Sequence, residues 1–81
     1  DGPPDPAMTK NMLKLRGYEF DEAGFFNAIR QNDVLAVKGF YDAGMNANAK
    51  NRIGETALTY AVINSELKTV KAVAERADVN M

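Results

Sequence analysis

Hydrophobic side chains recur at helical spacing along this chain, and in two stretches they occupy the same places 33 residues apart. The first stretch (FFNAIRQNDVLAV) covers residues 25–37, and the second (LTYAVINSELKTV) covers residues 58–70. Identical residues occur at three aligned pairs: Ala28 and Ala61, Val37 and Val70, Lys38 and Lys71. A fixed period of this size is typical of stacked helical units, each of which buries its apolar face on its neighbours.

The residues before the first stretch predict a separate helix. Asp5 can cap the free amides at its start, and Pro6 suits the first helical position. Gly17 favours a helix end, so the helix is expected to run to about Arg16. Its apolar side, with Met8, Met12 and Leu15, is expected to cover the open side of the first repeat. Its basic side, with Lys10, Lys14 and Arg16, is expected to face solvent.

The first stretch predicts a hairpin of an inner and an outer helix. Asp21 is the expected cap of the inner helix, residues 22–31, and Asp33 that of the outer helix. Ala43-Gly44 is expected to end the outer helix, because glycine readily adopts the positive φ of a helix end. The aromatic residues just before this hairpin, Tyr18 and Phe20, are expected to pack as part of an N-terminal cap.

The second stretch predicts a similar hairpin after a projecting polar loop at residues 46–55. Thr56 is the expected cap of an inner helix over residues 57–64, and Glu66 lies at the start of the outer helix. Its expected stacking positions are Leu67, Val70, Val73 and Ala74. With only two repeats, an exposed apolar face is expected around Leu58, Val62, Val70 and Val73, unless a further repeat or a second copy covers it.

Three strings resemble parts of the ankyrin repeat. Residues 54–61 (GETALTYA) are similar to the G-x-T-P-L-H-x-A motif of that family, with Ala57 in place of Pro and Thr59 in place of His. Residues 43–49 (AGMNANA) and 77–80 (ADVN) are similar to repeat ends. The resemblance covers about residues 20–81 and implies an all-α solenoid of two helix-turn-helix repeats, preceded by the N-terminal helix.

The resemblance also implies where a partner would bind. In ankyrin-repeat proteins the loop tips and the exposed face of the inner helices form a concave groove that binds other proteins. Matching positions here are Arg52, Ile53 and Glu55 at the loop tip, Ile63 and Asn64 at the end of the second inner helix, and Arg30 and Gln31 at the end of the first. Arg52 is a suitable contact residue, because a guanidinium group binds carboxylates and stacks on aromatic rings.

Composition argues against chemistry and against two classes of partner. The chain has neither histidine nor cysteine, and its serine at position 65 therefore lacks an activating histidine. Carboxylates such as Asp21 and Glu22 suit a helix start better than an acid–base pair. We therefore expect no enzyme activity, cofactor or metal site. A net charge of −1 predicts no strong attraction to nucleic acid or to a membrane, even though Lys10, Lys14 and Arg16 lie close together.

Together these observations predict one small domain at residues 5–81, after a flexible tail at residues 1–4. The expected division is a helix and cap at 5–19, a first repeat at 20–50 and a second at 51–81. The predicted function is non-catalytic binding of a partner protein. The alternative is a structural role as the capping or regulatory part of a longer array, of which we expect this chain to be the N-terminal piece; self-association through the second repeat also stays open.

Overall fold

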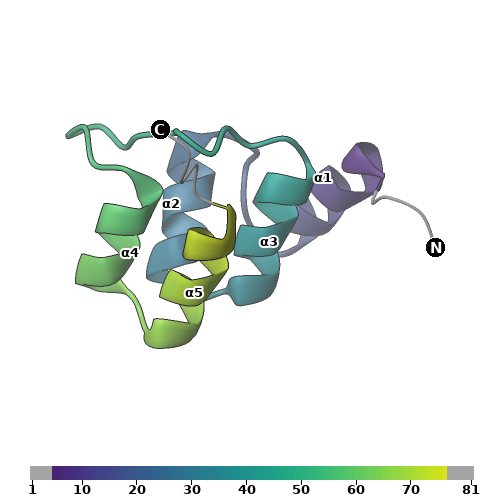
Figure 1. Ribbon diagram of the computed structural model, residues 1–81. Coiled ribbons are helices and arrows are strands. Elements are labelled where there is room, and N and C mark those ends of the chain that lie inside the picture. Colours follow the sequence, from purple (N-terminus) through teal and green to yellow (C-terminus); the bar gives the residue numbers. More distant parts are fainter. Residues whose placement is uncertain (1–4, 77–81) are drawn as a thin grey trace.

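The computed structural model describes residues 5–76, which form five α-helices and contain no β-strand (Figure 1). The helices are α1 (Pro6–Leu15), α2 (Glu22–Arg30), α3 (Val34–Asp42), α4 (Ala57–Asn64) and α5 (Leu67–Arg76). The predicted all-α class is therefore confirmed. The predicted tail at residues 1–4 and the repeat end at residues 77–80 lie outside the described residues.

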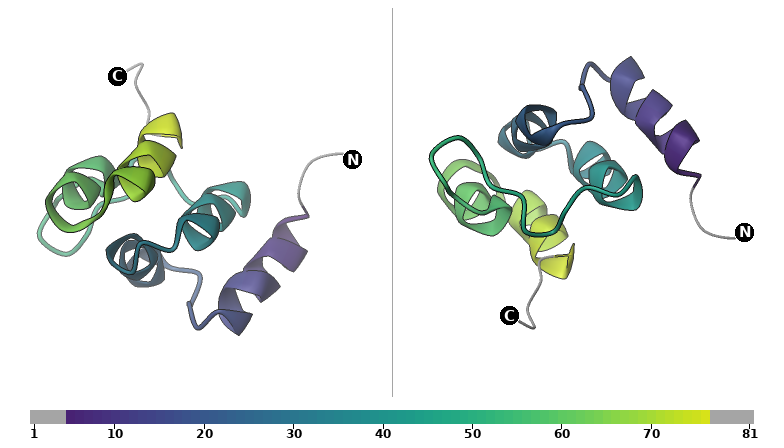
Figure 2. Two further views of the ribbon diagram at one scale, coloured as in Figure 1. Left: turned by 90° about the horizontal axis from the view of Figure 1, so that it is seen from below. Right: turned by 90° about the horizontal axis from the view of Figure 1, so that it is seen from above.

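The helices form three layers that follow one another across the molecule (Figure 2). The middle layer is the first hairpin, α2 and α3, and the outer layer on one side is the second hairpin, α4 and α5. α2 packs against α4, and α3 packs against α5. On the other side α1 packs against α3. α3 is therefore in contact with helices on both of its sides.

The helix starts are those predicted from capping residues. Each cap side chain accepts a hydrogen bond from a backbone amide in the first turn. The oxygen–nitrogen distances are 2.9 Å from Asp5 to Ala7, 2.7 Å from Asp21 to Gly24, 3.2 Å from Asp33 to Ala36 and 3.2 Å from Thr56 to Thr59. The end of α3 also follows the prediction, because Gly44 has a φ of +108°.

An aromatic cluster fills the first hairpin and joins it to the segment before it. Phe25 and Phe40 are fully buried, with ring centroids 5.5 Å apart. Tyr18 packs edge-on against Phe40 at 6.1 Å, and Phe20 stacks on the same ring at 5.6 Å. The prediction that Tyr18 and Phe20 pack as part of a cap is confirmed.

The predicted apolar side of α1 is correct at Met12, which is half-buried and packs on the core, and wrong at Met8 and Leu15. Met8 and Leu15 are 72% and 80% exposed, whereas Leu13 is fully buried. The contact surface opposite α1 is Gly39 in α3, which lacks a side chain. A Cβ at position 39 would lie 2.8 Å from Met12 Cε and 3.3 Å from Leu13 Cδ2, so the glycine lets the two helices approach closely. The buried stripe of α1 is therefore set by the gap over Gly39 rather than by the most hydrophobic side of the helix.

Polar bonds around Asn32 join the two hairpins. Asn32 has a φ of +59°, and its side-chain oxygen accepts hydrogen bonds from the Glu66 amide at 2.7 Å and the Thr69 hydroxyl at 2.9 Å. The Ser65 hydroxyl donates to the Ile29 carbonyl at 2.8 Å. Asn32 thus supplies the start of α5 with a hydrogen-bond acceptor from the neighbouring hairpin.

Small and aromatic residues complete this junction. Ala28 and Ala61 are fully buried where α2 meets α4, and their small side chains allow the two helices to approach closely. At the far end of α5, Arg76 pairs with Asp42 at 2.6 Å and lies 5.8 Å from the ring centre of Tyr41. Burial raises the pKa of Tyr41 to about 12, and the charge of Arg76 opposes that shift.

The exposed face of the second hairpin was predicted only in part. Val62 is 62% exposed, as expected, and Leu58 and Val70 are half-buried. Val73 is fully buried, so its predicted exposure is wrong. The stacking positions of α5 are Thr69, Ala72 and Val73, while Leu67 and Ala74 are exposed. The buried side of α5 therefore differs from the predicted one. Part of the reason is that the Thr69 hydroxyl donates a hydrogen bond to Asn32.

Candidate binding groove

The loop between the hairpins has an ordered tip. Lys50 and Thr56 form an antiparallel bridge at its base. Between them the Asn51 side chain accepts hydrogen bonds from the Ile53 amide at 3.2 Å and the Glu55 amide at 2.9 Å, and it donates one to the Glu55 carboxylate at 2.8 Å. A side chain that bonds its own loop in this way fixes the turn. The tip therefore holds Ile53 in solvent, where it is 79% exposed.

Two adjoining cavities lie between this loop tip and α2. Their volumes are 490 and 690 Å³. Both are lined by Ala23 and Phe26 of α2, Tyr60 of α4 and Arg52 of the loop. The Phe26 and Tyr60 rings meet edge-to-face, with centroids 5.3 Å apart. We refer to the joined cavities as the groove, and its floor is this aromatic pair.

The structure brings four of the seven predicted contact residues to the groove. Arg52, Ile53 and Glu55 line the first cavity, and Arg30 lines the second together with Arg52. The other three, Gln31, Ile63 and Asn64, line neither cavity. They lie at the carboxyl ends of α2 and α4, whereas the first cavity adjoins the start of α2. Their role in binding stays a prediction.

The aromatic floor was missed by the analysis of the sequence. Phe26 and Tyr60 do not align in the 33-residue repeat, since Phe26 pairs with Thr59. They meet only because α2 packs against α4, so the pair belongs to the junction and to neither repeat alone. The available signal was the presence of aromatic residues in both inner helices.

Charged groups in the groove differ in how far the protein itself satisfies them. The Asp21 carboxylate accepts from the Gly24 amide, and the Glu55 carboxylate accepts from Asn51. Arg30 donates to the Asn27 side chain at 3.0 Å. Within residues 5–76, the guanidinium of Arg52 has neither a hydrogen bond nor an ion pair. Arg52 is therefore the basic group in the groove with the most unused donors.

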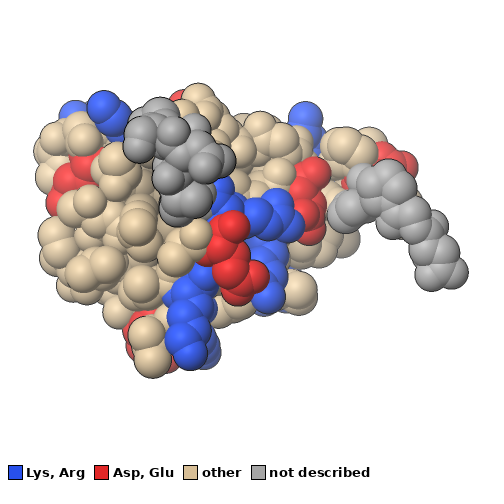
Figure 3. Space-filling view, viewed as in Figure 1, with Lys and Arg blue, Asp and Glu red and all other residues tan. Residues whose placement is uncertain are grey.

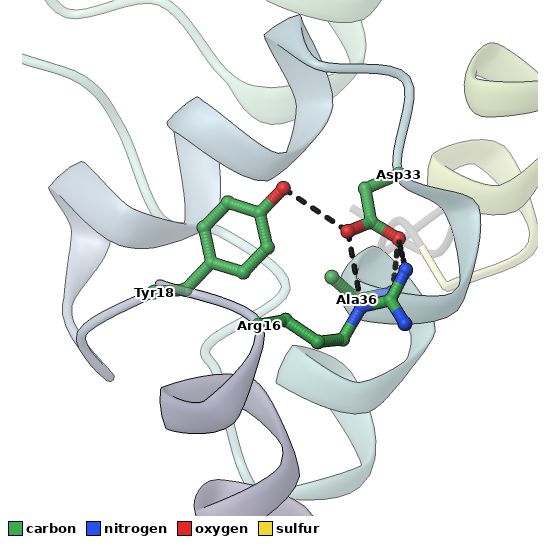
Figure 4. Close-up of polar contacts among 4 residues, drawn as sticks. All are labelled: Arg16, Tyr18, Asp33 and Ala36. Carbon is green, nitrogen blue, oxygen red and sulfur yellow. Dashed lines mark hydrogen bonds and ion pairs between the residues drawn. The ribbon is translucent and has the colours of Figure 1, made fainter.

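A second charged cluster surrounds Asp33, and one of its members, Tyr18, also lines the second cavity (Figure 4). Arg16 binds its two carboxylate oxygens at 2.7 and 3.1 Å, and the Tyr18 hydroxyl donates to it at 3.0 Å. Partial burial raises the pKa of Asp33, but the hydrogen bonds from Arg16, the Ala36 amide and Tyr18 outweigh it and hold that pKa below its ordinary value. All members of the cluster have partners, which indicates a structural connection between α1 and α3.

Neither a metal cluster nor a membrane-crossing helix is found in the part of the chain that the structure describes. No three carboxylate, imidazole or thiol side chains of residues 5–76 come together to hold a metal ion. None of the five helices is long and apolar enough to cross a membrane. Comparison with protein-family models, with curated proteins and with solved structures found no match for this chain.

Proposed function

We propose that this chain is a non-catalytic module that binds a partner protein in the groove between α2 and the 50–56 loop. The observation that carries the proposal is the floor of that groove. The half-buried Tyr60 ring lies there against the buried ring of Phe26, next to an exposed branched side chain at Ile53 and to Arg52, whose guanidinium has no partner among residues 5–76. Aromatic residues and arginine are enriched at protein interfaces because they combine large contact area with directed hydrogen bonds.

The arrangement of the helices is consistent with an ankyrin-like repeat, which we propose as the finer description of the fold. Two hairpins related by 33 residues lie side by side, and a loop with a single antiparallel bridge joins them. In that family the loop tips and inner helices are the binding surface, and here the groove lies between a loop tip and the inner helix α2.

The test is affinity capture from a lysate of cells that express the protein. The parent chain is compared with a double variant, Arg52→Ala and Ile53→Ala, in which the loop-fixing pair Asn51 and Glu55 is kept. The matched control is Leu35→Ala with Lys38→Ala, which removes an exposed aliphatic residue and a cation from α3, outside the groove. We expect a protein that is retained by the parent and the control but lost by the groove variant.

A structural role is the second candidate, and the exposed face of the second hairpin favours it. Val62 and Leu67 are 62% and 68% exposed on neighbouring helices. In Figure 3 the surface over α4 is largely uncharged, while charged side chains gather over α5 and α3. A variant with Val62→Ser and Leu67→Ser belongs in the same capture experiment. If it loses the retained protein while the groove variant keeps it, contact through this face replaces binding in the groove.

A further inference from the structure

The charge balance of the groove points to the chemistry of its partner, and this inference rests on the binding function proposed above. Four carboxylates and three cations line the two cavities: Glu19, Asp21, Glu22 and Glu55, and Arg30, Lys50 and Arg52. The total is close to neutral, so net charge does not decide which partner fits. What decides is which charged groups already have partners within the protein.

Two of the four carboxylates accept a hydrogen bond within the protein. Asp21 caps α2 through the Gly24 amide at 2.7 Å, and Glu55 accepts from Asn51 at 2.8 Å. Glu22 lies in the first turn of α2, where the helix dipole stabilises a negative charge. Glu19 stands in the linker before that helix, and its carbonyl rather than its carboxylate comes close to α2 over Gly24. A partner cation would have to compete with these interactions at two of the four groups.

Arg52, unlike Asp21 and Glu55, has no hydrogen-bond partner among residues 5–76. It is exposed, and its five guanidinium donors have no acceptor among residues 5–76. It lines both cavities, as Phe26 and Tyr60 do. The adjacent Ile53 adds an apolar wall to the first cavity. One position thus offers ring surface, an aliphatic side chain and unused donors side by side.

We propose that the groove binds a short acidic–apolar segment of a partner protein. In that segment a bulky apolar side chain lies against the half-buried ring of Tyr60, beside the buried Phe26, and a neighbouring Asp or Glu pairs with Arg52. The fork of the guanidinium matches the two oxygens of a carboxylate, and pairing beside an apolar floor is less screened by water than pairing on open surface. Specificity then comes from the combination of the two side chains.

Selection from a display library of random 12-residue peptides tests this directly. The parent is used beside Arg52→Glu and a matched control, Lys38→Glu, which reverses a charge on α3 outside the groove. Circular dichroism checks that all three are folded. We expect the parent and the control to enrich peptides with a large apolar residue next to Asp or Glu. The Arg52→Glu variant should bind those peptides about 10- to 100-fold more weakly, and should enrich Lys or Arg in their place.

The remaining outcomes separate the two proposals. Enriched peptides that need Ile53, tested with Ile53→Ala, but show no acidic preference and survive Arg52→Glu would overturn the acidic–apolar inference and leave the groove as a binding site. Peptides that bind equally to the parent, Ile53→Ala and Arg52→Glu, or the absence of any enrichment over an uncoated surface, would overturn both proposals.

Discussion

The two hairpins follow one sequence pattern, yet they are buried to very different extents. In α2 the core positions Phe25, Phe26 and Ile29 are buried. The aligned positions in α4 are Leu58, Thr59 and Val62, of which the first is half-buried and the others are exposed. The first hairpin lies between α1 and the second hairpin, as Figure 2 shows, whereas the described residues place a neighbour on only one side of α4 and α5. Position in the stack, rather than hydrophobicity, therefore sets how much each apolar side chain contributes.

The aligned pair Ile29 and Val62 tests this contrast with the largest expected effect. Ile29→Ala should lower the free energy of unfolding by about 2–5 kcal/mol, because it leaves a cavity at a fully buried position. Val62→Ala should change it by less than about 0.5 kcal/mol, because the side chain is mostly in solvent. Urea unfolding followed by circular dichroism measures both values.

Protein concentration is the control for that pair. If Val62→Ala proves as costly as Ile29→Ala at high concentration and harmless at low concentration, the exposed face is covered by a second copy in solution. Equal costs at every concentration would contradict the exposure of α4 itself.

Substitutions at Asn32 test the junction between the hairpins, and their expected effect on stability is intermediate in size. Asn32→Gly keeps the positive φ but removes the acceptor for Glu66 and Thr69, and should cost about 1–2 kcal/mol of stability. Asn32→Ala should cost about 1 kcal/mol more, since a Cβ is strained at that φ. Thermal unfolding of the two variants checks the order. Equal losses would show that the backbone geometry contributes nothing at this position.

The Asp33 cluster tests the junction with α1, with the smallest effect and a dependence on pH. The pKa of the Asp33 carboxyl in the folded state lies below its ordinary value. The cluster therefore stabilises the folded state fully at any pH above the pKa of an unfolded aspartate, about 3.9. That stabilisation is lost as the pH falls through the folded-state pKa. Asp33→Asn, which keeps a good capping residue, should therefore be less stable than the parent at neutral pH and should approach it in acid.

Glu66, which aligns with Asp33, supplies the matched control. It is exposed, and its carboxylate lies 3.8 Å from Lys68. Glu66→Gln should change the free energy of unfolding by less than about 1 kcal/mol, because exposed ion pairs contribute little. A difference as large as that of Asp33→Asn, measured by urea unfolding across the acid range, would mean that the geometry around Asp33 is not the source of the effect.

Structural features that are set by neighbouring residues could be predicted from the sequence, whereas features set by contacts between distant segments could not. Caps such as Asp21, Asp33 and Thr56 act within one turn of backbone, so their residue types alone located the helix starts. The buried side of α1 depends on a glycine 26 residues after Leu13, and the burial of Thr69 depends on Asn32 in the other hairpin. No pattern within either helix contains that information.

The candidate groove divides in the same way. Its loop tip was predicted through Arg52, Ile53 and Glu55, which stand together in the sequence. Its floor joins Phe26 and Tyr60 across two helices and required the packing of α2 on α4. The unused donors of Arg52 also depend on the folded arrangement, because only the structure shows which neighbouring carboxylates are already engaged.

The contact of α1 over Gly39 gives the stack a direction. A further hairpin could be placed beside α5 without moving any described residue of the face around Val62 and Leu67. On the opposite side, the surface of α3 is already taken up by Met12 and Leu13, and α1 would have to leave before another hairpin could pack there. Among residues 5–76, a further hairpin would therefore meet an exposed face at the second hairpin and a covered one at the first.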